Sequence, residues 1–129
     1  MDSKVIRAGI NSAIVALLSG VVLGTFGGWG ALFDLAPSFF GIVIMAAAFS
    51  IFLGYIYSYW FEDFLPGTAL VKGALFGILI WLVLLILGGV SDFFKEAVYA
   101  GNNGQILFLA LINHFVWGSS LSIFLESKG

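Results

Sequence analysis

The chain has no cysteine and few charged side chains. Only 9% of its 129 residues are charged, whereas about a quarter of a soluble domain is charged. The absence of Cys excludes disulfides, thiolate nucleophiles and Cys-ligated metal or iron–sulfur sites. Five basic residues spread along the chain make no basic patch, which excludes a nucleic-acid partner. This composition also excludes an ordinary soluble enzyme and a disordered tail.

Apolar side chains make up 61% of the sequence, and the mean hydropathy is +1.12. Four apolar runs are each long enough to cross a bilayer, which takes about 20 residues; they cover residues 6–26, 39–60, 69–90 and 105–125. Because backbone groups in lipid must hydrogen-bond internally, each run is expected to be a helix. The sequence predicts a single transmembrane domain over residues 1–129, an all-α membrane protein with a four-helix bundle.

The basic residues indicate how the bundle is oriented. Lys4, Arg7, Lys72 and Lys128 fall on the side that holds both ends and the middle connection, and only Lys95 falls on the other side. Cytoplasmic segments carry the excess of Lys and Arg. We therefore expect a multi-pass protein of the cell (inner) membrane with its N and C termini in the cytoplasm.

The second and fourth runs share a pattern at a distance of 64 residues. At a spacing of four, the second run carries Ile42, Ala46, Ser50, Gly54, Ser58 and Glu62, and the fourth carries Ile106, Ala110, His114, Gly118, Ser122 and Glu126. Five of the six positions are identical, and residues four apart share one face of a helix. The pattern predicts two similar helical hairpins, 1–64 and 65–128, related as parallel repeats.

Small residues at this spacing let membrane helices approach closely, which is how helices associate where no hydrophobic drive exists. The first run adds Gly20 and Gly24, and the third adds Gly73 and Gly77. We interpret these residues, with Ala46, Gly54, Ser58, Ala110, Gly118 and Ser122 of the shared pattern, as packing positions in preference to the lining of a pore.

His114 is the single histidine and lies near the middle of the fourth run, directly after Asn113. Polar side chains at that depth face the bundle or a water-filled cavity. Three interpretations stay open: a hydrogen bond between helices, a titrating or substrate-contacting group, or an axial ligand to haem or a chlorophyll-type pigment. No cofactor and no metal is predicted outright. Because Ser50 occupies the equivalent repeat position, we expect it to meet His114 at the bundle centre.

Charged and aromatic residues gather at the ends of the runs. Glu62 and Glu126 end two helices where a negative charge opposes the helix dipole, so we expect ion pairs that join them to Lys4, Arg7 or Lys72. The aromatic residues at the end of the second run are interpreted as an interface belt; they are Tyr55, Tyr57, Tyr59, Trp60, Phe61 and Phe64. Trp81 and Trp117 lie nearer mid-span and are expected to pack.

Two segments carry a resemblance. They are the G-x-x-x-G stretch from Gly73 to Trp81 and the H-x-x-x-G stretch from His114 to Gly118. On these motifs the chain resembles a family of small uncharacterised prokaryotic inner-membrane proteins with four helices. Members of that family often have a second histidine in helix two, where this chain has Ser50. The resemblance implies the topology and no activity.

The sequence contains no G-x-S-x-G, P-loop or H-E-x-x-H motif, so no enzyme is expected. Our leading expectation is a membrane protein that acts by helix packing, as a homo-oligomer or as an accessory subunit of a membrane complex. The alternatives are a small channel or transporter with a path near Ser50, Asn113 and His114, and a haem- or pigment-binding subunit that uses His114.

Overall fold

The computed structural model describes residues 3–23, 39–92, 95 and 104–126, and its long elements are all helices. Helix α1 covers Ser3–Leu23, α3 covers Phe39–Ile56 and continues as the π-helix η2 over Tyr57–Phe61, α4 covers Ala69–Val90, and α6 covers Gly104–Glu126. Four of the helical stretches are long and apolar enough to cross a membrane. The prediction of an all-helical chain with four spans is confirmed.

The helix ends follow local sequence signals. Before α4, Gly67 has a φ of +99°, a conformation that glycine adopts without a steric penalty, and the Lys72 N–H donates to Thr68 C=O to begin the helix. α1 begins three residues before its predicted start, because the polar residues Ser3 and Lys4 continue the apolar helix towards the membrane surface. Its predicted end at Phe26 and the predicted packing residue Gly24 lie outside the described residues.

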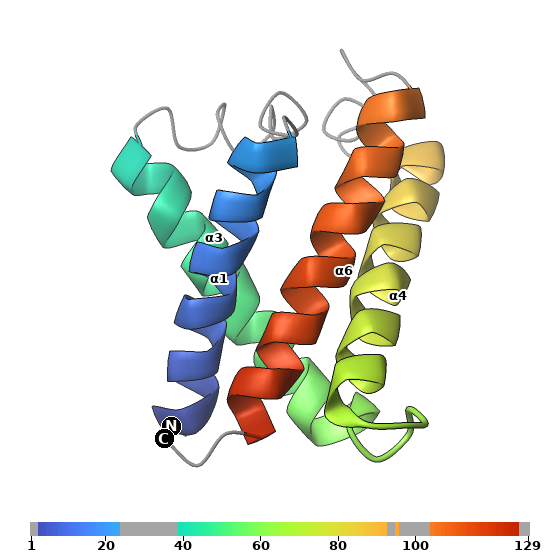
Figure 1. The fold of residues 1–129 in the computed structure, drawn as a ribbon. Coiled ribbons are helices and arrows are strands. Elements are labelled where there is room, and N and C mark those ends of the chain that lie inside the picture. Colours follow the sequence, from blue (N-terminus) through green and yellow to red (C-terminus); the bar gives the residue numbers. More distant parts are fainter. Residues whose placement is uncertain (1–2, 24–38, 93–94, 96–103, 127–129) are drawn as a thin grey trace.

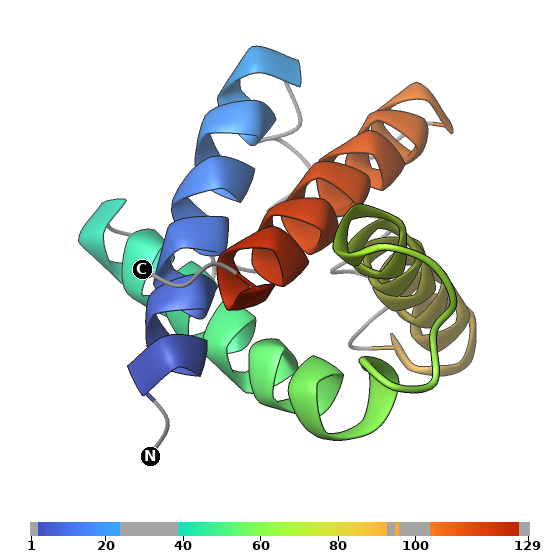
Figure 2. The ribbon, with the colours of Figure 1, turned by 60° about the horizontal axis from the view of Figure 1, so that its bottom comes forward.

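The helices run alternately up and down, and the first turn of α1, the last turn of α6 and the 62–68 connection lie at one end of the bundle (Figure 1). α6 packs against α1 and α4, and α1 packs against α3. Figure 2 shows α3 and η2 crossing the other helices until η2 approaches the first turns of α4. The array is thus ordered α3–α1–α6–α4, with η2 joining its two sides at one end.

The last turn before the 62–68 connection is the π-helix η2. The Glu62 N–H donates to Tyr57 C=O at 2.8 Å, a bond that spans five residues instead of four. Tyr57 is 2% exposed, whereas Tyr59 and Trp60 are 73% and 70% exposed. Tyr57 lies three residues after Gly54 and continues the buried face of α3 that carries Ser50 and Gly54, so its assignment to an interface belt was wrong.

An aromatic cluster forms the core at this end of the bundle. The Phe76 ring of α4 lies 5.2 Å from Tyr57, 5.3 Å from Phe61 and 5.9 Å from Trp117, measured between ring centroids. The cluster joins three helices and is closed by buried aliphatic residues of α1 and α6 that include Val5 and Leu121. Large apolar side chains on the outer faces are exposed, as expected of helices that face lipid.

Candidate functional site

The closest helix contact in the protein joins α4 and α6 through glycine. A Cβ atom added at Gly118 would lie 2.8 Å from the backbone N of Gly77 and would collide with the C=O of Gly73. Cβ atoms added at Gly73 and Gly77 would in turn meet the backbone carbonyls of Gly118 and His114. The two backbones touch directly, so any side chain larger than hydrogen at these positions must separate the helices.

The first hairpin has its own close approach. A Cβ added at Gly9 would lie 2.6 Å from the Ile51 side chain and 2.7 Å from its Cα atom, and one added at Gly54 would lie 3.3 Å from Val5. Among the remaining predicted packing residues, Gly20, Ala46 and Ser122 are buried, whereas Ser58 and Ala110 are partly buried. These positions lie inside helix contacts, with the tightest ones on glycine.

Ser50 lies on the buried side of α3 and hydrogen-bonds to α6. The indole Nε1–H of Trp117 donates to the Ser50 hydroxyl at 2.9 Å, and both side chains are buried. A buried tryptophan N–H needs an acceptor, and Ser50 supplies it. Ser50 is thus bonded to the residue three positions after His114, and no hydrogen bond joins it to His114 in the described structure.

Asn113 links α6 to α1. Its side-chain oxygen accepts a hydrogen bond from the Ser19 hydroxyl, and Asn113 is 4% exposed. Successive residues of a helix point about 100° apart, so Asn113 and His114 meet different neighbours. The polar residues of α6 are therefore distributed around the helix instead of sharing one centre.

His114 hydrogen-bonds within its own helix. Its Nδ1 lies 2.8 Å from the C=O of Ala110. A carbonyl oxygen only accepts, so Nδ1 carries the proton and Nε2 of the neutral ring keeps its lone pair. The ring is partly exposed. This tautomer leaves one nitrogen of the side chain available to a further partner.

Two further bonds join α4 and α6 at opposite ends of their contact. The Ser122 hydroxyl lies 2.5 Å from the C=O of Ala69, and the Trp81 Nε1–H donates to Leu107 C=O at 3.1 Å. The hairpin of α4 and α6 is therefore held by glycine contacts in its middle and by polar contacts on either side.

The charged residues at the ends of the helices were expected to pair. Arg7 and Glu126 are exposed, and Lys72 and Glu62 are partly exposed. Among the residues that the structure describes, no ion pair joins these four side chains. The pairing stays a prediction.

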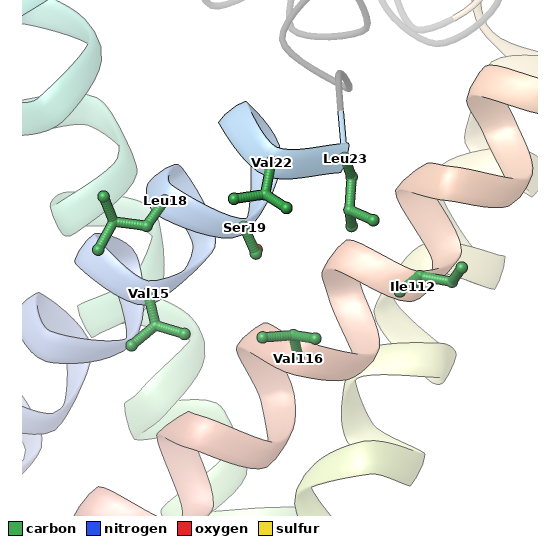
Figure 3. Close-up of a pocket in the computed structure, with 7 residues that line it drawn as sticks. All are labelled: Val15, Leu18, Ser19, Val22, Leu23, Ile112 and Val116. Atoms are coloured by element: carbon green, nitrogen blue, oxygen red, sulfur yellow. The ribbon is translucent and has the colours of Figure 1, made fainter.

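A shallow open groove of about 400 Å³ lies between α1 and α6. Figure 3 shows that its walls are aliphatic: Val15, Leu18, Val22 and Leu23 come from α1, and Ile112 and Val116 come from α6. Ser19 contributes the polar atom, and its hydroxyl is already bonded to Asn113. The groove suits a branched apolar side chain or a lipid chain better than water.

No group of three or more His, Cys, Asp or Glu side chains in the described part of the chain could hold a metal ion. Comparison with protein-family models, with curated proteins and with solved structures finds no match. The chemistry of this chain must therefore be argued from its own contacts.

Three partners in these contacts were missed by the sequence analysis: Ser19, Tyr57 and the indole of Trp117. The signal for two of them was present. An asparagine and a tryptophan at mid-span each require a hydrogen-bonding partner on another helix, which points to a serine at matching depth. Tyr57 follows Gly54 by three residues and so shares the helix face of Ser50 and Gly54, a spacing that the belt interpretation overlooked.

Proposed function

We propose that this protein acts by helix packing in the membrane, as a homo-oligomer or as an accessory subunit of a larger membrane complex. The observation that carries the proposal is the bonding of α6. Side-chain hydrogen bonds join it to three helices: Asn113 to Ser19 of α1, Trp117 to Ser50 of α3, and, with α4, Ser122 to the Ala69 carbonyl and the Trp81 indole to the Leu107 carbonyl. On this proposal the chain has no catalytic activity of its own.

The same bonds weigh against a conducting path. A path needs polar groups that face a shared water-filled space. Ser50 and Asn113 each bond to a different helix, and the groove beside Asn113 is lined by aliphatic side chains. Polar side chains used in this way act as interhelical contacts, which are worth about 0.6–2 kcal/mol each in membranes.

The native mass of the protein in its own membrane tests the proposal. We expect the chain, extracted in mild detergent, to migrate as a small homo-oligomer or within an assembly whose other chains co-purify stoichiometrically. Migration as a monomer would contradict it. Ser50→Ala and His114→Ala are expected to change the thermal stability of the protein and to leave solute flux in liposomes unchanged. A solute flux that either substitution abolishes would favour the transporter alternative instead.

A second candidate function is supported by the His114 ring. Its Nδ1 is bonded to the Ala110 carbonyl, and a histidine that binds a metal commonly donates its other ring nitrogen to such a carbonyl. Nε2 would serve as an axial ligand to haem or a chlorophyll-type pigment. This candidate requires a visible absorption band in the purified protein that His114→Ala removes. Phe115→Ala, a change at an exposed neighbouring residue, should retain the band.

We further propose that the two hairpins, α1–α3 and α4–α6, are parallel repeats and that both termini lie on the cytoplasmic side of the cell (inner) membrane. Gly9 and Gly73, 64 residues apart, are both points of close helix approach, which supports the repeat. Their partners are not equivalent, since Gly9 meets Ile51 and Gly73 meets Gly118 and Ser122. The repeats would therefore share an ancestral pattern and differ in helix register.

A further inference from the structure

Asn11 is an exposed polar side chain deep in a span. The hydroxyls of Ser12, Ser19 and Ser50 and the carboxamide of Asn113 all take part in hydrogen bonds. Asn11 is exposed on α1, and no group among the described residues hydrogen-bonds to its carboxamide. Its two donors and its carbonyl acceptor thus point to the space where lipid would lie.

The depth of Asn11 follows from its neighbours. Gly9 packs against Ile51, and Ile51 lies at the middle of the 22-residue span Phe40–Phe61. Asn11 is two residues further along α1, about 3 Å along the helix axis. It therefore lies within one turn of mid-span, where lipid supplies no hydrogen bonds and an unpaired amide is strongly unfavourable.

The exposed face around Asn11 suits another helix. Arg7, Asn11, Ile14, Leu18 and Val21 are all exposed and follow one another at spacings of three and four. This spacing is the seam pattern of paired helices, in which one central asparagine fixes register and stoichiometry. The Arg7 side chain lies one turn from Asn11 and is long enough to extend to the lipid headgroups.

A hollow accompanies this face. The groove between α1 and α6 is lined by Leu18 and Val22, which lie two and three turns beyond Asn11 on its side of α1. A helix laid along α1 would place its own aliphatic side chains into that groove. The face therefore offers one polar contact at mid-span and an apolar hollow above it.

We propose that α1 is the seam of a homodimer in which the Asn11 carboxamides of two copies hydrogen-bond to each other. A carboxamide is self-complementary, because it carries both donors and an acceptor. A two-fold axis brings a residue against its own copy. A second copy of the chain therefore satisfies the hydrogen-bonding groups of Asn11 with no additional group. The inference rests on the proposed function, since it names one surface through which the chain assembles.

The absence of native cysteine makes a direct test available. Leu18→Cys on the seam and Ile86→Cys on α4 are matched reporters, because the parent side chains are 63% and 65% exposed and lie in the last two turns of α1 and α4. Each variant of the full chain is oxidised in its native membrane. We expect a covalent dimer from Leu18→Cys and little from Ile86→Cys.

Asn11 is then replaced in the Leu18→Cys background. Asn11→Leu is expected to lower the association constant of the dimer about tenfold, the effect of removing one strong interhelical hydrogen bond, and Asn11→Gln is expected to restore it. Because no group in the described part of the chain bonds to the Asn11 carboxamide, Asn11→Leu should leave the melting temperature of the monomer in excess detergent unchanged. A lower melting temperature would place the amide in an internal contact and overturn the proposal.

Other outcomes separate this inference from the proposed function. Equal cross-linking at both reporters, or insensitivity to Asn11→Leu, overturns the α1 seam. If the chain then still migrates within an assembly, the packing function stands without this seam. If Leu18→Cys instead cross-links to a different protein, the face binds a heterologous subunit and the homodimer is wrong. Migration as a monomer overturns both proposals.

Discussion

At the scale of single residues, glycine determines how closely the helices approach. Lipid tails are as apolar as leucine side chains, so helices in a bilayer gain little by hiding apolar surface from lipid. What remains is van der Waals contact and hydrogen bonding. Gly73, Gly77 and Gly118 bring two backbones into direct contact, and this contact brings Ser122 within reach of the Ala69 carbonyl.

Gly118→Ala is therefore expected to destabilise the protein by about 1–3 kcal/mol, the usual penalty for overpacking a tight contact. The added methyl group meets backbone atoms of Gly73 and Gly77, which cannot rotate away. Gly89→Ala in α4 is the matched control, because nothing lies within 4 Å of a Cβ at Gly89. Thermal unfolding in detergent, followed by helical circular dichroism, measures both. Equal melting temperatures would contradict the tight contact.

The hydrogen bond between Trp117 and Ser50 is a second residue-scale test. We expect Trp117→Phe and Ser50→Ala each to destabilise the fold, because each leaves a partner unpaired in a buried site. In the double variant the losses should not add, and the coupling free energy should be about 0.6–2 kcal/mol. The same thermal unfolding measurement gives this cycle. Strict additivity would show that the bond contributes nothing.

At the scale of elements, the π-helix η2 connects the two sides of the helix array. It follows directly from α3, and its first residue, Tyr57, lies against Phe76 of α4 while Tyr59 stays exposed. π-turns inside α-helices are rare and concentrate at functional positions. Here the turn gives α3 a contact with α4 that the order of the array does not otherwise provide.

Two tyrosines of this turn form a matched pair. Tyr57→Ala removes a ring that is 2% exposed and is expected to destabilise the protein by about 3–5 kcal/mol, as large core truncations do. Tyr59→Ala removes a ring that is 73% exposed and should change stability by less than about 0.5 kcal/mol. Comparison of the two melting temperatures checks this. Similar losses of stability would mean that the Tyr57 and Tyr59 rings do not differ in burial.

The sequence predicted the bounds of the helices well and the contacts between the helices poorly, for one physical reason. The length of an apolar run fixes a membrane helix, so α4 begins and ends at the predicted residues 69 and 90. Helices that are apolar all round carry no periodic signal that tells the inner face from the lipid face. The partners of Ser50 and Asn113 depend on helix tilt and rotation, which that missing signal would have supplied.

At the scale of the whole molecule, the last helix along the chain holds the others together. α6 packs between α1 and α4 and is hydrogen-bonded to α1, α3 and α4. The contacts with α1 and α3 join the second hairpin to the first. Through Asn113 and Trp117, α6 supplies hydrogen bonds that hold the second hairpin to the first, which makes α6 the element that completes the bundle.

The side of the membrane on which the ends of the bundle lie is a prediction about the whole molecule. The first turn of α1 and the last turn of α6 lie at the same end as the 62–68 connection, and basic residues favour the cytoplasm for that end.

With no native cysteine, Thr68→Cys and Gln105→Cys report the two ends separately, and both parent residues are exposed. In intact cells a membrane-impermeant maleimide should label Gln105→Cys and leave Thr68→Cys unlabelled until the cells are opened. The reverse pattern would invert the topology. Equal labelling would show that the chain inserts in both directions, and two oppositely inserted copies would no longer align their α1 helices in parallel.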